Sequence, residues 1–186
     1  MRSAWESLPA ADEEGNVLAV IESPAGSRCK FKFEPSYGVF LLHGILPIGT
    51  AFPHAFGFVP STLAEDGDPL DILVLVDEAA PVTTVVPCRI VAVLEAQQKN
   101  HGKMIRNDRL LGIAVASERY AQCRKRKDIE QTVLDRIADF FAFYHREQGK
   151  HFQPKRWKGR KTALKLLESG QRAFLKHRSS ERKSPQ

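Results

Sequence analysis

The chain has 186 residues, the length of one ordinary domain, and a formal net charge of +6. Hydrophobic residues make up 42% of it and charged residues 27%, which supplies a globular core and excludes a fully disordered chain. The longest uninterrupted aliphatic run, Ile72–Val76, is far shorter than the ~20 residues of a membrane-spanning helix, so we expect no membrane span.

The first sixteen residues are polar and aperiodic, and they predict a flexible lead-in, residues 1–16, to a domain over residues 17–177. They also lack the charged start and apolar stretch of a secretory signal. Short apolar runs separated by Gly, Pro and Asp then predict strands at residues 17–21, 29–34, 39–42, 72–76, 90–94 and 110–115. Because no long helix separates these runs, they favour an antiparallel sheet or a small closed barrel.

The apolar pattern changes to a helical period in the last third of the chain. Over residues 128–145, apolar side chains recur every three or four positions and predict one helix stripe, formed by Ile129, Val133, Ile137, Phe141 and Tyr144. A second helix is predicted over Thr162–His177, with Ala163, Leu167 and Phe174 on its inner face. The sequence therefore indicates a mainly β domain with C-terminal helices.

Positive charge is concentrated at the C-terminal end. Residues 150–186 carry a net charge of +10, whereas residues 1–149 carry −4. Such a segment either binds nucleic acid or another polyanion, or forms a solvated helix face followed by a frayed end. We favour the solvated face, because runs of charge usually lie at the surface. We expect residues 178–186 to be a basic disordered tail.

The acidic segment Glu65–Asp71 is the most informative motif. Its carboxylates at Asp66, Asp68 and Asp71 can converge only if the backbone bends, which Gly67 permits through a positive φ and Pro69 through its fixed φ. Hard oxygen ligands on a turn suit Mg²⁺, which keeps several waters and shares phosphate oxygens. Taken alone, the Asp-Gly pair is also common in hairpin turns, and a structural turn is then the favoured interpretation.

Three further segments accompany this turn, namely Ile21–Phe31, Ala51–Leu63 and Phe140–His145. In this order and spacing, the chain resembles the family I soluble inorganic pyrophosphatases over residues 17–175. The resemblance implies an OB-like five-stranded small β-barrel flanked by two or more helices. It also implies Mg²⁺ as cofactor, pyrophosphate as substrate, a cytoplasmic location and a homo-hexamer. The three cysteines, which form no Cys-x-x-Cys pair, agree with a reducing compartment.

The resemblance also implies roles for individual residues. Asp66 and Asp71 match metal ligands, and Glu22 matches the outer acidic residue of the metal site. Asp68 matches the carboxylate that orients or deprotonates the attacking water, while Lys30 and Tyr144 match phosphate-binding positions of the catalytic centre. The chemistry suits these residue types, because hydrolysis of pyrophosphate requires cations that offset the phosphoryl charge and a group that activates water.

Several positions depart from the family pattern. Lys32 replaces a glutamate, and Gly44, with His43 beside it, replaces a phosphate-binding arginine. His145 replaces a lysine, which leaves a substrate-binding residue that is a weaker cation at neutral pH. The tyrosines of the aromatic segment become phenylalanines that lack the hydroxyl donor, namely Phe52, Phe56 and Phe58.

The second acidic run of the family is also changed, within Gln97–Leu110. Asn107 lies where a metal ligand belongs, Asp108 is one place off, and Arg109 takes the position of a substrate-binding lysine. Because adjacent strand residues point to opposite faces, Asp108 can serve as the metal ligand only if the loop shifts by one residue. Fewer carboxylates predict fewer bound metals, and the added cations could replace part of the lost charge.

The leading hypothesis is a divergent Mg²⁺-dependent hydrolase of pyrophosphate with reduced or altered activity. It requires the three carboxylates of the turn to surround a hydrated cation, and a lysine ammonium between them would contradict it. The alternative is a catalytically impaired module that binds a phosphorylated ligand on the same fold. A nucleic-acid binder is not favoured, because Phe31 and Phe33 alternate as core residues would.

Overall fold

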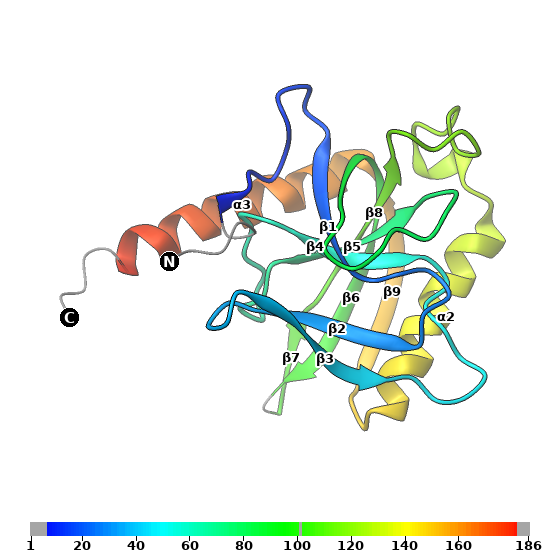
Figure 1. The fold of residues 1–186 in the computed structure, drawn as a ribbon, viewed down its shortest axis with the longest axis horizontal. Coiled ribbons are helices and arrows are strands. Elements are labelled where there is room, and N and C mark those ends of the chain that lie inside the picture. Colours follow the sequence, from blue (N-terminus) through cyan, green and yellow to red (C-terminus); the bar gives the residue numbers. More distant parts are fainter. Residues whose placement is uncertain (1–6, 101, 182–186) are drawn as a thin grey trace.

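Five strands in the described part of the chain close into a small barrel, seen in the computed structural model in Figure 1. The structure describes residues 7–100 and 102–181. The barrel strands are β1 (Val17–Ser23), β4 (Ala55–Val59), β5 (Leu70–Leu75), β8 (Arg109–Ala114) and β6 (Val85–Asn100). They pair in that order, and β6 returns to pair with β1. The expected OB-like five-stranded barrel is thereby confirmed.

Strand directions differ from a purely antiparallel sheet at one place. β5 and β8 run parallel, with Asp71 opposite Arg109, whereas β1–β4, β4–β5, β6–β8 and β1–β6 are antiparallel. Gly57 allows β4 to approach β1 closely, because a Cβ at that position would lie 1.9 Å from the carbonyl oxygen of Val20. The parallel pair matters for function, since it brings the acidic turn beside the start of β8.

Two clusters of buried side chains hold the barrel and helices together. The first takes residues from all five barrel strands and includes Ala163 and Leu167 of α3 (Arg160–Glu181). The second lies between the barrel and α2 (Gln131–Glu147), and it includes Ile137 and Phe141. Successive β5 residues join different clusters, so this strand is buried on both faces, which is why it forms an unbroken aliphatic run.

The two expected helices are present, with different bounds. The apolar stripe of α2 faces the core as predicted, and a short 3₁₀ turn, η1 (Arg126–Asp128), precedes it. α3 begins before the predicted start and runs to Glu181, so the predicted disordered tail is wrong for residues 178–181. Good helix formers without Gly or Pro follow Gly170, so nothing stops the helix there. The rest of the tail, 182–186, lies outside the described residues.

The described part of the predicted lead-in, residues 7–16, is not loose. The side chain of Asp12 accepts hydrogen bonds from the backbone N–H groups of Glu14 and Asn16, at 3.0 and 2.8 Å. Ala10 is buried, and its carbonyl accepts the N–H of Leu18. This segment therefore packs onto the start of β1, while residues 1–6 lie outside the described part.

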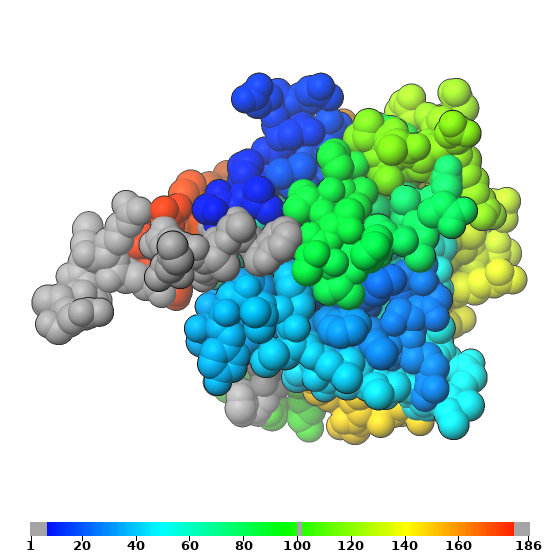
Figure 2. Space-filling view, viewed as in Figure 1, coloured from blue at the N-terminus to red at the C-terminus, as the bar shows by residue number. Residues whose placement is uncertain are grey.

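Four strands lie outside the closed ring. β2 (Cys29–Glu34) and β3 (Val39–Ile45) form a separate hairpin, which makes up much of the lower half of the face in Figure 2 (blue to cyan). β7 (Lys103–Arg106) and β9 (Phe152–Gly159) both pair with β6. Along with β4, strands β7 and β9 were not predicted. Among the described helices, none has the length and apolar character needed to cross a bilayer.

Candidate active site

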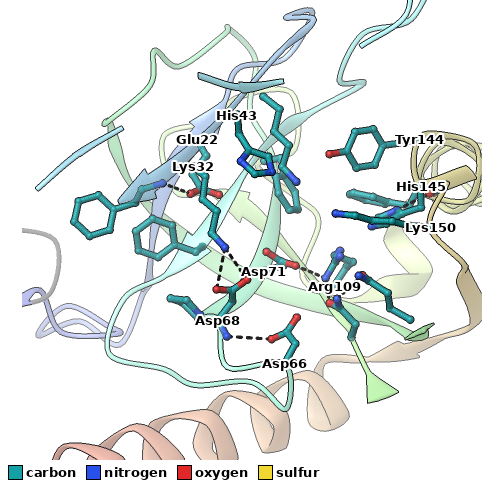
Figure 3. A pocket seen from close by; sticks show the side chains of 18 of the residues that line it. Glu22, Lys32, His43, Asp66, Asp68, Asp71, Arg109, Tyr144, His145 and Lys150 are labelled. Atoms are coloured by element: carbon teal, nitrogen blue, oxygen red, sulfur yellow. Dashed lines mark hydrogen bonds and ion pairs between the residues drawn. The ribbon is translucent and has the colours of Figure 1, made fainter. Parts of the chain in front are cut away.

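A cavity of about 380 Å³ lies between the barrel, the β2–β3 hairpin and the C-terminal end of α2 (Figure 3). Glu22 at the end of β1, Lys30 and Lys32 on β2, and Asp71 on β5 all line it. Tyr144 and His145 come from α2 on the other side. The remaining charged or amide side chains of its wall are Glu34, His43, Asp66, Asp68, Gln98, Asn107, Arg109 and Lys150. Segments far apart in sequence thus meet at one site.

The acidic turn presents all three of its predicted carboxylates to this cavity. Gly67 has a φ of 88°, and the N–H of Asp68 donates to Oδ1 of Asp66 at 3.2 Å. The turn is anchored where the N–H of Leu70 donates to the hydroxyl of Thr62 at 2.9 Å. Burial raises the pKa of Asp66 above its ordinary value. The three carboxylates therefore share one cavity, as the sequence predicts, and their role there stays a prediction.

The ammonium of Lys32 lies on Asp68, so the outcome that would contradict the sequence hypothesis is met at this carboxylate; in the described part of the chain Lys32 pairs with neither Asp66 nor Asp71. Nζ of Lys32 is 3.1 and 3.0 Å from the two carboxylate oxygens, and both side chains are about half exposed (48% and 53%). Burial disfavours the ammonium, but hydrogen bonding and attraction to Asp68 outweigh this and raise the pKa of Lys32. An ion pair this exposed contributes only about 0–1 kcal/mol and opens readily.

Asp71 is paired as well, with the buried guanidinium of Arg109. The same guanidinium donates to the side-chain oxygen of Asn107. Three aromatic rings surround it, at 5.2–5.9 Å from ring centre to guanidinium carbon, namely those of Phe56, Phe141 and Phe152. Burial raises the pKa of Asp71 and Arg109 opposes that rise. Nε of Arg109 is buried and has no hydrogen-bond partner among the described residues.

The prediction that Asp108 is a metal ligand is wrong. One of its oxygens accepts the backbone N–H of Ala96 at 2.9 Å, and the other accepts two nitrogens of Arg106 at 2.6 Å. The side chain is buried but does not line the cavity, whereas Asn107 and Arg109 do. The loop has not shifted by one residue, so strand alternation turns Asp108 away.

Glu22 lines the cavity at its inner end. Its carboxylate accepts the N–H of Phe33 at 3.0 Å, and burial raises its pKa to about 7. This side chain is therefore partly protonated at neutral pH. It adds less negative charge to the cavity than the sequence suggests.

Cationic side chains and hydrogen-bond donors also line the cavity. Lys30 lies with Nζ 5.3 Å from the centre of the Tyr144 ring, and neither Lys30 nor Lys150 forms an ion pair in the described part of the chain. Burial and then repulsion by Lys30 and Lys32 lower the pKa of Lys150. The hydroxyl of Tyr144 is buried without a partner among the described residues. These groups suit an anionic ligand.

His145 lines the cavity, as expected, but it is not a cation. Its Nδ1 lies 2.8 Å from the carbonyl oxygen of Phe141, and its ring stacks on Phe152 at 4.4 Å. Burial, followed by repulsion from Arg109, lowers its pKa to about 3. The imidazole is therefore neutral at pH 7, and the prediction of a weak cation is wrong for a reason that only packing reveals.

The carboxylates do not form a preformed cluster for several metal ions. Within residues 7–100 and 102–181, no three His, Cys, Asp or Glu side chains converge to hold a metal. Lys32 and Arg109 neutralise two of the three acidic side chains of the turn, while Asp66 forms no ion pair in that part of the chain. Asp66 is therefore the carboxylate of the turn that is left for a cation, and a hard cation that takes its other ligands from water and ligand oxygens needs only one or two protein carboxylates.

Comparison with known proteins decides the family. Residues 19–174 match the model of the inorganic pyrophosphatase family. The chain belongs to this family. A curated inorganic pyrophosphatase from Thermus thermophilus is 34% identical over 86% of this chain and 91% of that protein. One from Synechocystis is 32% identical over 87% of this chain and 93% of that protein. A crystal structure from Thermus thermophilus superposes with a TM-score of 0.85 at 31% identity, and covers 92% of this chain and 99% of that chain.

Two cationic residues of this pyrophosphatase-family site were not assigned a role from sequence. Lys32 was noted only as a departure, although its spacing from Lys30 places both on one face of β2, and this alternation could have found it. Lys150 follows α2 in a short polar stretch and carries no local signal. His43, which stands beside Gly44 in the sequence, lines the cavity. Its pKa is lowered by burial and then by Lys30.

Proposed function

We propose that this chain hydrolyses inorganic pyrophosphate to two phosphates, that it uses Mg²⁺ for this, and that its turnover is reduced. One observation carries the proposal: the carboxylates of Asp66, Asp68 and Asp71 face the same cavity as Lys30 and Tyr144. Acidic and cationic groups around one cavity suit a polyanion whose phosphorus atom is attacked by water, with cleavage of the P–O–P bridge. Family membership supports the same reaction.

The chain's own residues bind and orient the substrate. Lys30 and Lys150 face the phosphoryl oxygens, and the hydroxyl of Tyr144 and Nε of Arg109 donate hydrogen bonds to them. Asp68 accepts a hydrogen bond from the attacking water and takes up its proton. For this, the ammonium of Lys32 must leave Asp68, which its exposed position allows at small cost.

Mg²⁺ would be held by Asp66, because the other ligand predicted on the turn, Asp71, is paired with Arg109 and Asp68 serves the attacking water. Bound there, it would offset phosphoryl charge and lower the pKa of a coordinated water. The reduced turnover follows from what the cavity lacks: Asn107 brings an amide where a carboxylate would ligate metal, and Phe56 and Phe58 bring no hydroxyl donors.

Release of phosphate from pyrophosphate tests the proposal. Purified protein is assayed with Mg²⁺, Mn²⁺, Co²⁺ and Zn²⁺ and with EDTA, and we expect turnover that requires a divalent metal. Asp68→Asn should lower kcat by about 100- to 10,000-fold, the usual share of a general base. Asp139→Asn is the matched control, because Asp139 is exposed on α2 and outside the cavity. Absence of turnover with every metal would end the proposal.

A second candidate function is binding of a diphosphate without hydrolysis. The ion pairs Lys32–Asp68 and Arg109–Asp71 favour it, because they neutralise the groups that catalysis needs. Calorimetry would then give tight binding of pyrophosphate with no release of phosphate. Robust turnover that Asp68→Asn abolishes would exclude this candidate.

We further propose that the chain forms a homo-oligomer, with a hexamer as the expected size. Three apolar side chains on and after β3 support this, because Leu42, Ile45 and Ile48 are 54, 62 and 90% exposed. Sedimentation velocity of the purified protein measures the assembly, and Ile48→Glu with Ile45→Glu should dissociate it. A monomer at micromolar concentration would contradict the proposal.

The proposed location is the cytoplasm. Cys29, Cys88 and Cys123 are all free thiols, which supports a reducing compartment. Fractionation of the source cells followed by immunodetection tests this, and recovery with a secreted or membrane fraction would contradict it.

A further inference from the structure

The cavity contains protein cations at places where its own carboxylates would otherwise attract metal ions. Lys32 forms an ion pair with Asp68, and Arg109 forms one with Asp71. Each pair offsets the negative charge of one carboxylate of the cavity. A bound anion can therefore find its counter-charge in the protein itself rather than in a metal.

The lysines of the cavity are also close enough to repel one another. Burial, and after it repulsion from Lys30 and Lys32, lowers the pKa of Lys150; burial, and after it repulsion from Lys30, Lys150 and Lys32, lowers the pKa of His43. An anion placed between these side chains relieves this repulsion. The cationic wall thus favours an anionic ligand before any metal is added.

Two residues that line the cavity each carry a buried donor without a partner. Tyr144 and Arg109 are each more than nine-tenths buried, with exposures of 5 and 4%. The Tyr144 hydroxyl and Nε of Arg109 have no hydrogen-bond partner among the described residues, and both residues line the cavity. A buried donor without an acceptor costs about 1–3 kcal/mol, so a ligand with several acceptor oxygens stabilises this arrangement.

We propose that the cavity binds a diphosphate anion without any divalent metal, and that Lys32 moves from Asp68 to the phosphate when it does so. The proposal concerns the same site as the proposed hydrolysis and rests on it for the class of ligand. Lys32 can make this movement because its ion pair is half exposed, whereas the buried Arg109 stays in place. Lys32 is then the residue that sets how much binding depends on metal.

Calorimetric titration of the full chain with methylenediphosphonate, a diphosphate that cannot be hydrolysed at its bridge, tests the proposal. Titrations are run in EDTA and in Mg²⁺. We expect binding in EDTA, with an affinity less than tenfold below that in Mg²⁺. A parallel titration with ADP tells whether the diphosphate is recognised as the free anion or within a nucleotide, and metal-free binding of either supports the proposal.

Variants of Lys32 sharpen the test. Lys32→Gln and Lys32→Glu should weaken binding in EDTA by about 10- to 100-fold, the value of one or two hydrogen bonds to a charged group. Lys32→Glu should in addition bind Mn²⁺ more tightly than the unchanged protein, because Asp68 gains a second carboxylate in place of an ammonium. Lys165→Glu is the matched control, since Lys165 is exposed on α3 and outside the cavity.

The outcomes separate this inference from the proposed hydrolysis. Binding only in Mg²⁺, or binding in EDTA that both Lys32 variants leave unchanged, overturns the inference while hydrolysis stands. Binding in EDTA that Lys32→Gln weakens supports the inference, even if no metal gives turnover. Absence of binding under both conditions overturns the inference and removes the basis of the proposed substrate.

Discussion

Two segments border the same cavity and have diverged in opposite ways. The turn Asp66–Asp71 keeps three carboxylates that all face the cavity. The start of β8 also has an acidic residue, Asp108, yet that side chain points away and contacts Arg106 and the backbone of Ala96. The acidic character of a segment therefore says little about its role until each side chain is assigned to a face.

The two ion pairs of the acidic turn also differ in how they are built. Lys32–Asp68 is half exposed and joins β2 to the turn, whereas the guanidinium of the Arg109–Asp71 pair is enclosed by aromatic rings. An exposed pair contributes little and exchanges partners easily, but breaking a buried pair leaves a charge without compensation. We infer that the Lys32–Asp68 pair can open when a ligand binds, and that the Arg109–Asp71 pair belongs to the fixed structure of the site.

Loss of the buried partner should have the largest effect. Asp71→Asn leaves the guanidinium of Arg109 among aromatic rings without its counter-charge, and we expect the free energy of unfolding to fall by about 3–5 kcal/mol. Urea denaturation measures this, with Asp139→Asn as the exposed control. A loss below about 1 kcal/mol would mean that Arg109 is solvated and not part of the fixed structure of the site.

The buried imidazole of His145 should make the free energy of unfolding depend on pH. Its pKa is about 3 in the folded chain and near 6.5 when unfolded, so its contribution is present above pH 6.5 and is lost as pH falls toward 3. Between pH 7 and pH 4 this amounts to about 3 kcal/mol. His145→Phe keeps the stack on Phe152 and should reduce the loss by that amount, measured by denaturation at several pH values. Equal pH profiles for the two proteins would show that His145 is not buried neutral.

Asp108→Asn tests whether Asp108 stabilises the fold or binds a metal. It weakens the contacts to Arg106 and Ala96, and we expect stability to fall by about 2–3 kcal/mol. The affinity for methylenediphosphonate in Mg²⁺ should stay unchanged, in contrast to Asp66→Asn, which should weaken it. If Asp108→Asn weakened Mg²⁺-dependent binding as much as Asp66→Asn, the carboxylate would belong to the site after all.

The smallest effect on stability is expected for Lys32→Gln. This variant breaks only the half-exposed pair with Asp68, so unfolding should change by less than about 1 kcal/mol. Urea denaturation beside Asp71→Asn gives the direct contrast between the half-exposed pair and the buried one. A loss as large as that of Asp71→Asn would make the two pairs equivalent.

Local patterns carried much of the prediction. The period of apolar residues located four of the five barrel strands and both helices, and the positions of Gly67 and Pro69 located the turn. β4 was missed because its apolar run is interrupted by Gly57, whose role depends on contact with β1. β9 was missed because its charged residues and Pro154 read as a loop, although they lie on a strand that pairs with the long β6.

What the sequence determined by itself is the inventory: a turn that gathers three carboxylates, strands and helices in a family order, and lysines that alternate along one strand. Only the tertiary structure decided which charges meet. Lys32 reaches Asp68 across 36 residues of chain, and Asn107 lines the cavity whereas Asp108 does not. Burial, and after it repulsion from Arg109, lowers the pKa of His145. The physical reason is that periodicity is a local property, whereas ion pairing and desolvation depend on neighbours brought together by strand register and packing.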